Sequence, residues 1–286
     1  LAAEATGVSQ QAVSKAIAKL EDELGVQLFE RSAFGATPTA FARTLERRAQ
    51  TILAETRLAN AELNALSGAK HGTLNLGVGL TLAREIIAHA IHRFRAQRPG
   101  IGIGAMIDVS PVLYQRLLRG EIDLVASSPP EYVEIPPDIT TVRLFMEQDQ
   151  VTVRPSHPLA KAKRITLSDL VPYPWIAPLQ NYSLWLRICD AFSAAGIAPP
   201  KDVIRTDSVP LTLGLLTSED CICLLGREMM AHELRAGELI ALKIEGQPLS
   251  PERPALLAYR SKGALSPAAK AFIPLLREVC QGVRYR

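Results

Sequence analysis

The side chains best suited to chemistry in this chain lie near its start, in the segment VSQQAVSKAIAKLEDELGVQLF at positions 8–29. Amide, hydroxyl and ammonium groups of this kind can bind base edges and phosphates in a DNA major groove. They occupy the first turns of an expected helix, which is the part of a recognition helix that enters the groove. The residues that we expect to contact DNA are Ser9, Gln10, Gln11, Ser14 and Lys15, with Arg31 in the segment that follows.

The element that must position these groups is an amphipathic helix. Ser9 is a good N-cap, because its hydroxyl can accept a hydrogen bond from the first turn. The helix should end at about Leu24, since Gly25 is a favourable terminator. Its buried face should consist of Ala12, Val13, Ala16, Ile17 and Leu20, which recur at helical spacing. On periodicity alone, an ordinary surface helix explains this pattern equally well.

A longer run of residues carries a family resemblance. This run resembles the winged helix-turn-helix of the LysR-type transcriptional regulators: Ala2-Ala3, Val8-Ser9-Gln10, Ala12, Ser14, Leu20-Glu21, Glu23-Leu24-Gly25, Leu28-Phe29 and Arg31, continuing through Gly35 and Thr39. The family more often has Pro at the position of Gln11 and Arg at that of Lys15. Lys15 keeps the charge but lacks the bidentate fork that suits guanine. Family members carry a further helix before this point, so the resemblance implies that the first helix of the motif is missing and that Leu1–Thr6 ends it.

The resemblance implies a ligand-responsive, sequence-specific regulator that binds double-stranded DNA. It assigns residues 1–39 to the winged helix-turn-helix domain, with a hairpin wing over Gln27–Thr39, and residues 40–67 to a linker helix. That second segment contains neither Gly nor Pro up to Leu66, and heptads fit it. The two heptad positions are Ala42, Ala49, Thr56 and Leu63, and Leu45, Ile52, Ala59 and Leu66. The helix is therefore expected to pair two chains, with packing on its own domain as the alternative. Family members usually form homotetramers, so the chain itself is an expected partner, and RNA polymerase is a further candidate.

Residues 73–286 have an α/β pattern after a polar hinge at 67–72. Strands and helices alternate from Thr73–Leu80 to Ile122–Ala126, which predicts a parallel sheet. A second set of strands and helices begins near Val151, and a final strand (Ala255–Tyr259) and helix (Pro267–Cys280) return to the first set. Two α/β halves joined by two crossings form the periplasmic-binding-protein type of fold. Subdomain I should span about 73–146 and 249–286, and subdomain II about 147–248, and the resemblance makes both an effector-binding domain.

An effector should bind between these halves, because ligands of open α/β sheets bind beyond the carboxyl ends of the strands. The candidate effector-binding residues follow those ends: Leu80, Thr81, Ser110, Ser128, Tyr182, Ser183, Thr206 and Ser208. The N–H groups of helix N-termini favour an anion, so a small carboxylate is a candidate effector. Each hydroxyl can instead serve only as a helix cap.

Composition and missing motifs exclude several other functions. The chain has 286 residues, 48% of them hydrophobic and 21% charged, and a net charge of +3. It has no apolar run long enough for a membrane span and no secretory signal, so we expect a cytoplasmic protein without a membrane partner. The four cysteines are expected to be thiols, and Cys221 and Cys223 to be buried rather than metal ligands or redox sensors.

No enzyme motif is present, since the sequence lacks G-x-S-x-G, G-x-G-x-x-G and a P-loop. We therefore expect neither catalysis nor a metal or cofactor other than a small-molecule effector. A solute-binding module of the same fold that does not read DNA is the alternative function. The attached helix-turn-helix argues against it.

Overall fold

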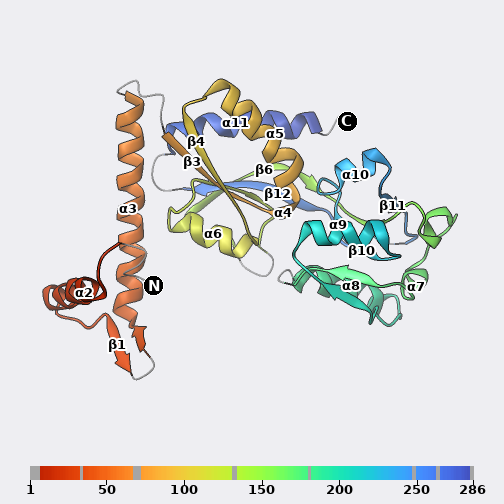
Figure 1. Ribbon diagram of the computed structural model, residues 1–286, viewed down its shortest axis with the longest axis horizontal. Coiled ribbons are helices and arrows are strands. Elements are labelled where there is room, and N and C mark those ends of the chain that lie inside the picture. Colours follow the sequence, from red (N-terminus) through yellow and green to blue (C-terminus); the bar gives the residue numbers. More distant parts are fainter. Residues whose placement is uncertain are drawn as a thin grey trace. The chain divides into compact units, whose positions relative to one another are not determined.

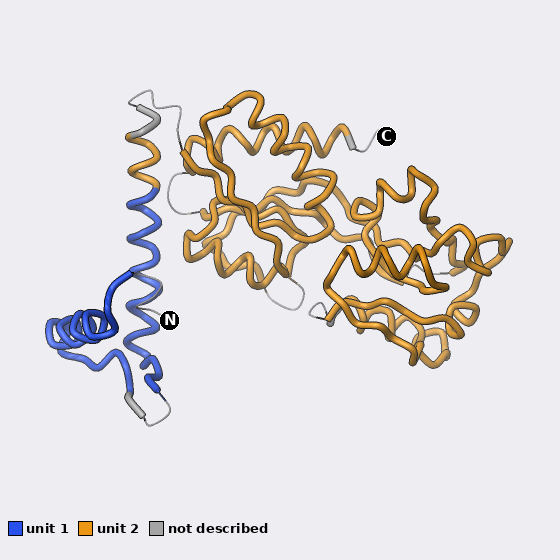
Figure 2. Tube along the Cα trace, viewed as in Figure 1, with its two compact units in different colours: residues 1–57 blue, residues 58–286 orange. Residues whose placement is uncertain are grey.

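A computed structural model of the chain describes residues 7–32, 35–66, 72–130, 134–179, 182–246, 249–261 and 265–283. The chain divides into two compact units, residues 1–57 and 58–286 (Figure 2). Each unit is considered by itself below. The secondary-structure elements carry the labels of Figure 1.

The first unit contains helix α2 (Gln10–Leu24) and a two-stranded hairpin, β1 (Phe29–Ser32) and β2 (Gly35–Pro38). The predicted ends of α2 are confirmed: the Ser9 hydroxyl accepts from the backbone N–H of Ala12 at 3.2 Å, and Gly25 closes the helix in the left-handed region at φ 66°. The hairpin is antiparallel, with Glu30 opposite Thr37. It forms the predicted wing.

The wing is tied to α2 by the carboxylate of Glu21. Glu21 accepts hydrogen bonds from the backbone N–H groups of Leu28 and Phe29, at 2.6 and 3.0 Å. Leu28 itself is buried. These bonds fix where the wing leaves the helix, so Glu21 sets the spacing between α2 and the hairpin.

The expected buried face of α2 is not buried by this structure. Val13 and Ile17 are half-buried, whereas Ala12, Ala16 and Leu20 are exposed. The prediction relied on a preceding helix to cover this face, and Leu1–Thr6 lie outside the described residues.

Helix α3 (Ala40–Leu66) is the predicted linker helix, 27 residues long. Thr39 caps it, because its hydroxyl accepts from the backbone N–H of Ala42 at 3.2 Å. Several apolar side chains of the helix point to solvent, with exposed fractions of 65% for Ile52 and 62% for Leu63. Both belong to the predicted heptad positions, whereas Ala42 of the same positions is buried, so the seam is partly exposed within the single chain.

The second unit contains two five-stranded sheets. The first, in the order β4-β3-β5-β12-β6, is called subdomain I together with its helices. Strand β3 is parallel to β4 and β5, and β12 is antiparallel to β5 and β6. The strands are β3 (Gly72–Val78), β4 (Ile101–Ile107), β5 (Leu124–Ser127), β6 (Ile139–Glu147) and β12 (Arg253–Arg260).

The second sheet, in the order β11-β7-β10-β8-β9, defines subdomain II. Strands β10, β8 and β9 are mutually parallel neighbours, and β7 is antiparallel to β10 and β11. The strands are β7 (Asp149–Val153), β8 (Trp175–Ala177), β9 (Val203–Arg205), β10 (Ile222–Gly226) and β11 (Ile240–Leu242).

Helices cover both faces of each sheet, as Figure 1 shows for α5 and α11 on one side of the first sheet and α6 on the other. In subdomain II, α8 and α9 pack on opposite faces. The helices of this unit are α4 (Leu80–Leu82), the π-helix η1 (Ala83–Ile87), α5 (Ala88–Gln97), α6 (Ser110–Leu118), the 3-10 helix η2 (Pro158–Lys161), α7 (Leu167–Leu170), α8 (Tyr182–Ala194), α9 (Val209–Ser218), α10 (Ala231–Ala236) and α11 (Pro267–Val283).

The expected α/β fold of two halves joined by two crossings is confirmed, with three differences. The first sheet is mixed rather than parallel, because the returning strand β12 and the long strand β6 run antiparallel to the others. Strands β6 and β11 were not expected. The sequence pattern also favours a helix near Arg227–Arg235, and the structure has the shorter α10 there, since Arg227 lies in the turn that precedes it.

Candidate functional site

A cavity of about 630 Å³ lies between the two sheets of the second unit. Its walls are the segments that follow the carboxyl ends of β3, β4 and β5 in subdomain I, and of β8, β9 and β10 in subdomain II. This is the position at which open α/β sheets bind ligands, and the volume is typical of a small-molecule site.

Five of the eight predicted effector-binding residues line this cavity, namely Leu80, Thr81, Ser110, Ser128 and Thr206. Thr81 stands in the first turn of α4 and also faces subdomain II. A β-carbon added to Gly226 would lie 2.5 Å from the Thr81 methyl carbon. A glycine is therefore needed where the two subdomains approach each other at Thr81.

Of the other three predicted residues, one caps a helix, and the side chains of two are outside the described part of the chain. The Ser208 hydroxyl accepts from the backbone N–H of Leu211 at 3.4 Å, so it caps α9, and Ser208 is not among the described residues that line the cavity. Tyr182 and Ser183 begin α8, but their side chains lie outside the described part of the chain. Their contact with an effector stays a prediction. The same holds for Asn181, the residue before α8, which also lies outside the described part of the chain.

Two of the predicted hydroxyls direct their protons into the protein. The Ser110 hydroxyl donates to the carbonyl oxygen of Ser128 at 2.8 Å, and the Ser128 hydroxyl donates to the Glu147 carboxylate. Ser110 and Ser128 therefore offer the cavity lone pairs rather than protons. Thr206 accepts from the backbone N–H of Ser208 at 3.0 Å.

Sequence reasoning missed the charged residues of the cavity. Asp108, Asp149, Asp207 and Arg253 all line it. Asp108 and Asp207 follow the ends of β4 and β9, so the strand-end rule that selected the neighbouring hydroxyls would also have found them. Asp149 and Arg253 lie in the two crossings between subdomains, and no local pattern in the sequence brings them together.

The crossings are joined by a buried ion pair. The Arg253 guanidinium lies 3.0 and 3.1 Å from the two carboxylate oxygens of Asp149, and the Ser250 hydroxyl donates to Asp149 at 2.7 Å. The exposed fractions of the Asp149 and Arg253 side chains are 3% and 19%. This pair, which we call the hinge pair, ties the two crossings to each other.

A second buried carboxylate, that of Glu147, stands next to this hinge. Burial raises the pKa of Glu147, while the hydrogen bond from Ser128 and the charge of Arg253 act in the opposite direction. Its Oε1 has no hydrogen-bond partner among the described residues. Glu147 links the end of β6 to the cavity wall through Ser128.

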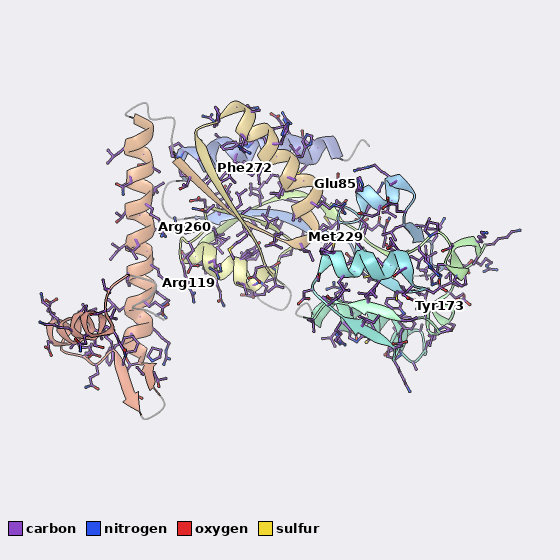
Figure 3. All side chains as sticks on the ribbon, viewed as in Figure 1. Glu85, Arg119, Tyr173, Met229, Arg260 and Phe272 are labelled. Atoms are coloured by element: carbon purple, nitrogen blue, oxygen red, sulfur yellow. The ribbon has the colours of Figure 1, made fainter. Side chains whose placement is uncertain are left out.

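The subdomains are also joined by two reciprocal ion pairs, which we call the clasp. Arg84 bonds to Glu233 at 2.5 Å, and Arg235 bonds to Glu85 at 3.0 Å. Arg84 and Glu85 belong to the π-helix η1, whereas Glu233 and Arg235 belong to α10. Figure 3 labels Glu85 close to Met229, a cavity residue just before α10. π-Helical turns are rare and frequently occur at functional sites.

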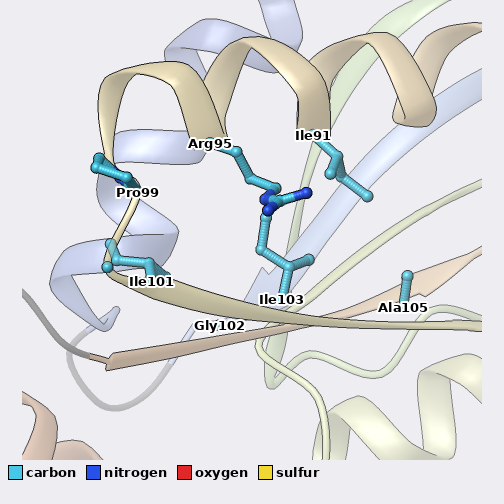
Figure 4. Close-up of a pocket in the computed structure, with 8 residues that line it drawn as sticks. Ile91, Arg95, Pro99, Ile101, Gly102, Ile103 and Ala105 are labelled. Atoms are coloured by element: carbon cyan, nitrogen blue, oxygen red, sulfur yellow. The ribbon is translucent and has the colours of Figure 1, made fainter.

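A second hollow, of about 530 Å³, lies on the edge strand β4 beside α5. Figure 4 shows the Arg95 side chain reaching toward Ile103 across it. It contains none of the predicted effector-binding residues. It also lies along the strand rather than beyond the strand ends, so the cavity between the sheets is the candidate effector site.

The cysteines have the predicted character of buried thiols. Cys221 and Cys223 are 1% and 2% exposed, and burial raises the pKa of both. A raised pKa keeps a thiol protonated and poorly nucleophilic. Within the described residues, no group of His, Cys, Asp and Glu is arranged to hold a metal ion, and no helix is long and apolar enough to cross a membrane.

In the first unit, the predicted DNA-facing residues stand at the start of α2. Gln10, Gln11 and Lys15 are exposed and Ser14 is half-buried, so their polar groups are open to a partner. Ser9 serves as the cap described above. Arg31 belongs to β1, and its side chain lies outside the described residues. Base or phosphate contact by these six residues stays a prediction.

Comparison with known proteins agrees with this arrangement. The family model described as "LysR substrate binding domain" matches residues 67–281, and the model described as "Bacterial regulatory helix-turn-helix protein, lysR family" matches residues 1–43. The chain is 32% identical over 231 residues to the HTH-type transcriptional regulator GbpR of Rhizobium radiobacter, covering 80% of this chain and 76% of that protein.

A second relative and a solved structure extend over almost the whole chain. The HTH-type transcriptional regulator GalR of Pseudomonas putida is 31% identical over 278 residues, covering 96% of this chain and 68% of that protein. A full-length variant of OxyR from Pseudomonas aeruginosa superposes with a TM-score of 0.67 at 23% identity, covering 98% of this chain and 88% of that one. The structural likeness concerns the fold alone.

Proposed function

Because the chain belongs to the LysR family of ligand-responsive, DNA-binding transcriptional regulators, we propose that its cavity holds a small-molecule effector that controls how α2 and the wing engage DNA. The observation that carries the proposal is the cavity itself. Segments from both subdomains form its walls, so a bound molecule contacts both and favours one angle between them. The hinge pair and the clasp are the contacts through which that angle is set.

The DNA-reading part of the proposal rests on α2 and the wing. We assign Gln10, Gln11, Ser14 and Lys15 to the major groove, Arg31 to the wing contact and Ser9 to the cap that begins the helix. Glu21 holds the wing against the helix, so both elements meet the duplex as one body. This function places the protein in the cytoplasm, in contact with chromosomal DNA.

Pairing of two chains is proposed through α3. Its exposed apolar residues include Ile52, Leu53 and Leu63, with exposed fractions of 65%, 59% and 62%. Burial of such a stripe against a second copy would stabilise a dimer, as heptad seams do. Two recognition helices then reach successive major grooves of an interrupted palindrome. A homotetramer, and contact with RNA polymerase, are proposed from the family resemblance alone.

The experiment that tests the function is selection of bound fragments from a genomic library by the protein. We expect recovery of one interrupted palindrome. Recovery of unrelated fragments whose binding depends only on salt would contradict the regulator and favour a solute-binding module.

Substitutions in α2 then test the residue assignments on that palindrome. Gln11→Ala should lower affinity at one base position by about 1–3 kcal/mol, whereas loss of a phosphate contact by Lys15→Ala should weaken all sequences and lower the salt slope by about 1. Lys19→Ala is the matched control, because Lys19 is 78% exposed on the same helix but lies beyond its first turns. Unchanged affinity in both test variants would remove α2 from the groove.

Pairing through α3 has its own test. Ile52→Asp places a charge in the exposed seam and should convert dimers into monomers in sedimentation equilibrium without unfolding the chain. Glu55→Lys, on the same helix outside the heptad positions, is the control. A dimer that survives Ile52→Asp would assign pairing to another surface.

A further inference from the structure

The polar groups of the cavity are mostly hydrogen-bond acceptors. Three carboxylates line it, those of Asp108, Asp149 and Asp207, and Arg253 is the one cation among its described lining residues. That guanidinium is held by both oxygens of Asp149, at 3.0 and 3.1 Å. Among the described residues of the wall, the one cation is therefore already paired with a carboxylate.

Three of the hydroxyl and thiol donors of the cavity are already bonded within the protein. The Ser110 and Ser128 protons go to the Ser128 carbonyl and to Glu147. The Cys223 thiol, which also lines the cavity, donates to the carbonyl oxygen of Ile176 at 3.3 Å. Each of these donors is used within the protein, so a ligand finds oxygen lone pairs at these points. A molecule that binds there must bring its own protons.

The charges of the cavity are compensated from within the protein. Asp108 and Asp207 directly precede the N-caps of α6 and α9, where the positive ends of the helix dipoles offset a negative charge. Each also accepts a backbone N–H, Asp108 from Val109 and Asp207 from Leu179, both at 2.8 Å. Asp149 is compensated by Arg253. The site thus has carboxylate acceptors without a strong demand for a cationic ligand.

Apolar side chains form the rest of the wall. Leu80, Ile107, Ile176, Leu184 and Met229 line the same cavity. A ring that carries hydroxyl groups at its edge and C–H groups on its faces fits both kinds of surface. An added carboxylate would instead meet three carboxylates and acceptor oxygens, and its lost hydration would not be replaced.

From this arrangement we infer that the effector is a neutral, polyhydroxylated molecule of monosaccharide size, whose hydroxyl groups donate to Asp108 and Asp207 and to the hydroxyl oxygens of the wall. This inference rests on the proposed function of the cavity as the effector site. It differs from the carboxylate that the helix N-termini alone favour, because aspartates of the chain itself stand directly before the N-caps of α6 and α9.

Calorimetric titration of the full chain tests the ligand class. The probes are the neutral aldohexoses and aldopentoses, each compared with its own aldonate, which has a similar size and the same configuration at the hydroxyl-bearing carbons but is open-chain and anionic. At least one neutral sugar should bind about tenfold or more tightly than its aldonate, since a charge-assisted hydrogen bond is lost and a like charge is added. Tighter binding of an aldonate, or binding of no neutral sugar, overturns the inference.

A matched pair of variants ties the result to the cavity. Asp108→Asn keeps the oxygen that accepts from Val109 and replaces the other oxygen with a donor. It should weaken the neutral sugar about tenfold and strengthen its aldonate. Asp190→Asn, at an exposed position of α8 away from the cavity, should change neither affinity. Equal effects of the two variants overturn the inference.

Selection of genomic DNA is independent of these titrations. A chain that selects one palindrome but binds only aldonates would retain the regulator function and lose the inferred ligand class. A chain that binds neutral sugars but selects no DNA sequence would retain the inferred ligand class and lose the regulator function.

Discussion

Removal of one side chain from the clasp should destabilise the second unit by more than its position near the surface implies. The Arg84–Glu233 pair is unequal, since the side chains are 41% and 6% exposed. Glu233 Oε2 has no partner among the described residues, so loss of Arg84 leaves a buried carboxylate without its cation. Breaking a buried pair costs about 3–5 kcal/mol. The exposure of Arg84 admits water and reduces this to about 2 kcal/mol for Arg84→Ala.

The second pair of the clasp supplies the internal control. Glu85 and Arg235 are 27% and 59% exposed. Removal of Arg235 should therefore cost only about 0.2–1 kcal/mol, as for other surface ion pairs. In the double variant Arg84→Ala/Glu233→Gln no buried charge remains, so about 1–2 kcal/mol of the loss from Arg84→Ala should be recovered as a coupling energy.

The assay is urea unfolding of the full chain, followed by tryptophan fluorescence and far-ultraviolet circular dichroism. Both tryptophans of the chain, Trp175 and Trp185, belong to the core of subdomain II, so fluorescence reports on that subdomain. If the clasp couples the subdomains, Arg84→Ala should move the fluorescence transition to lower urea. A cost no greater than that of Arg235→Ala, or no coupling with Glu233→Gln, would refute the reasoning.

Three further predictions concern single positions. Gly226→Ala should cost about 1–3 kcal/mol through the close approach to Thr81, and Thr81→Ser, which removes the methyl group, should restore stability in urea unfolding if that contact is the cause. Burial lowers the pKa of His157 from its usual 6.5, and its Nδ1 accepts from the backbone N–H of Leu159, so stability should fall as pH falls below 6.5 toward the folded-state pKa. His157→Asn keeps an acceptor without titrating, so it should flatten unfolding free energy against pH in this range, and an unchanged slope would exclude His157. The Tyr114 hydroxyl is buried without a partner among the described residues, so Tyr114→Phe should raise stability by about 1 kcal/mol, and a loss in thermal unfolding would show that the hydroxyl is bonded.

Local patterns in the sequence predicted those parts of the fold that depend on neighbouring residues. Ser9 and Gly25 set the ends of α2 through bonds and backbone angles within a few positions, and both were identified correctly. The strands that precede Thr81, Ser110 and Thr206 were found for the same reason. Their shared location followed from the rule that the carboxyl ends of parallel strands meet at one edge.

Contacts between distant segments were beyond such reasoning. The pairing of β12 with β6 and the bond between Asp149 and Arg253 join residues that are about a hundred positions apart. Arg84 and Glu233 are farther apart still, and nothing near either position marks it as one half of a pair. The charge of the cavity depends in part on these contacts. The sequence alone therefore favoured a carboxylate effector, whereas our inference from the structure is an effector that donates hydrogen bonds.

The place of β12 in the first sheet determines the order in which the chain can fold on the ribosome. Subdomain II is built from one continuous stretch between β7 and β11, so it can pack as soon as that stretch has emerged. The sheet of subdomain I can be completed only later, because β12 stands between β5 and β6. Helix α11, which follows β12 in the chain, covers that sheet last. Until residue 260 is made, β5 and β6 have unpaired edges, and such edges favour aggregation. The nascent chain is thus most prone to aggregation at a stage when subdomain II is already folded.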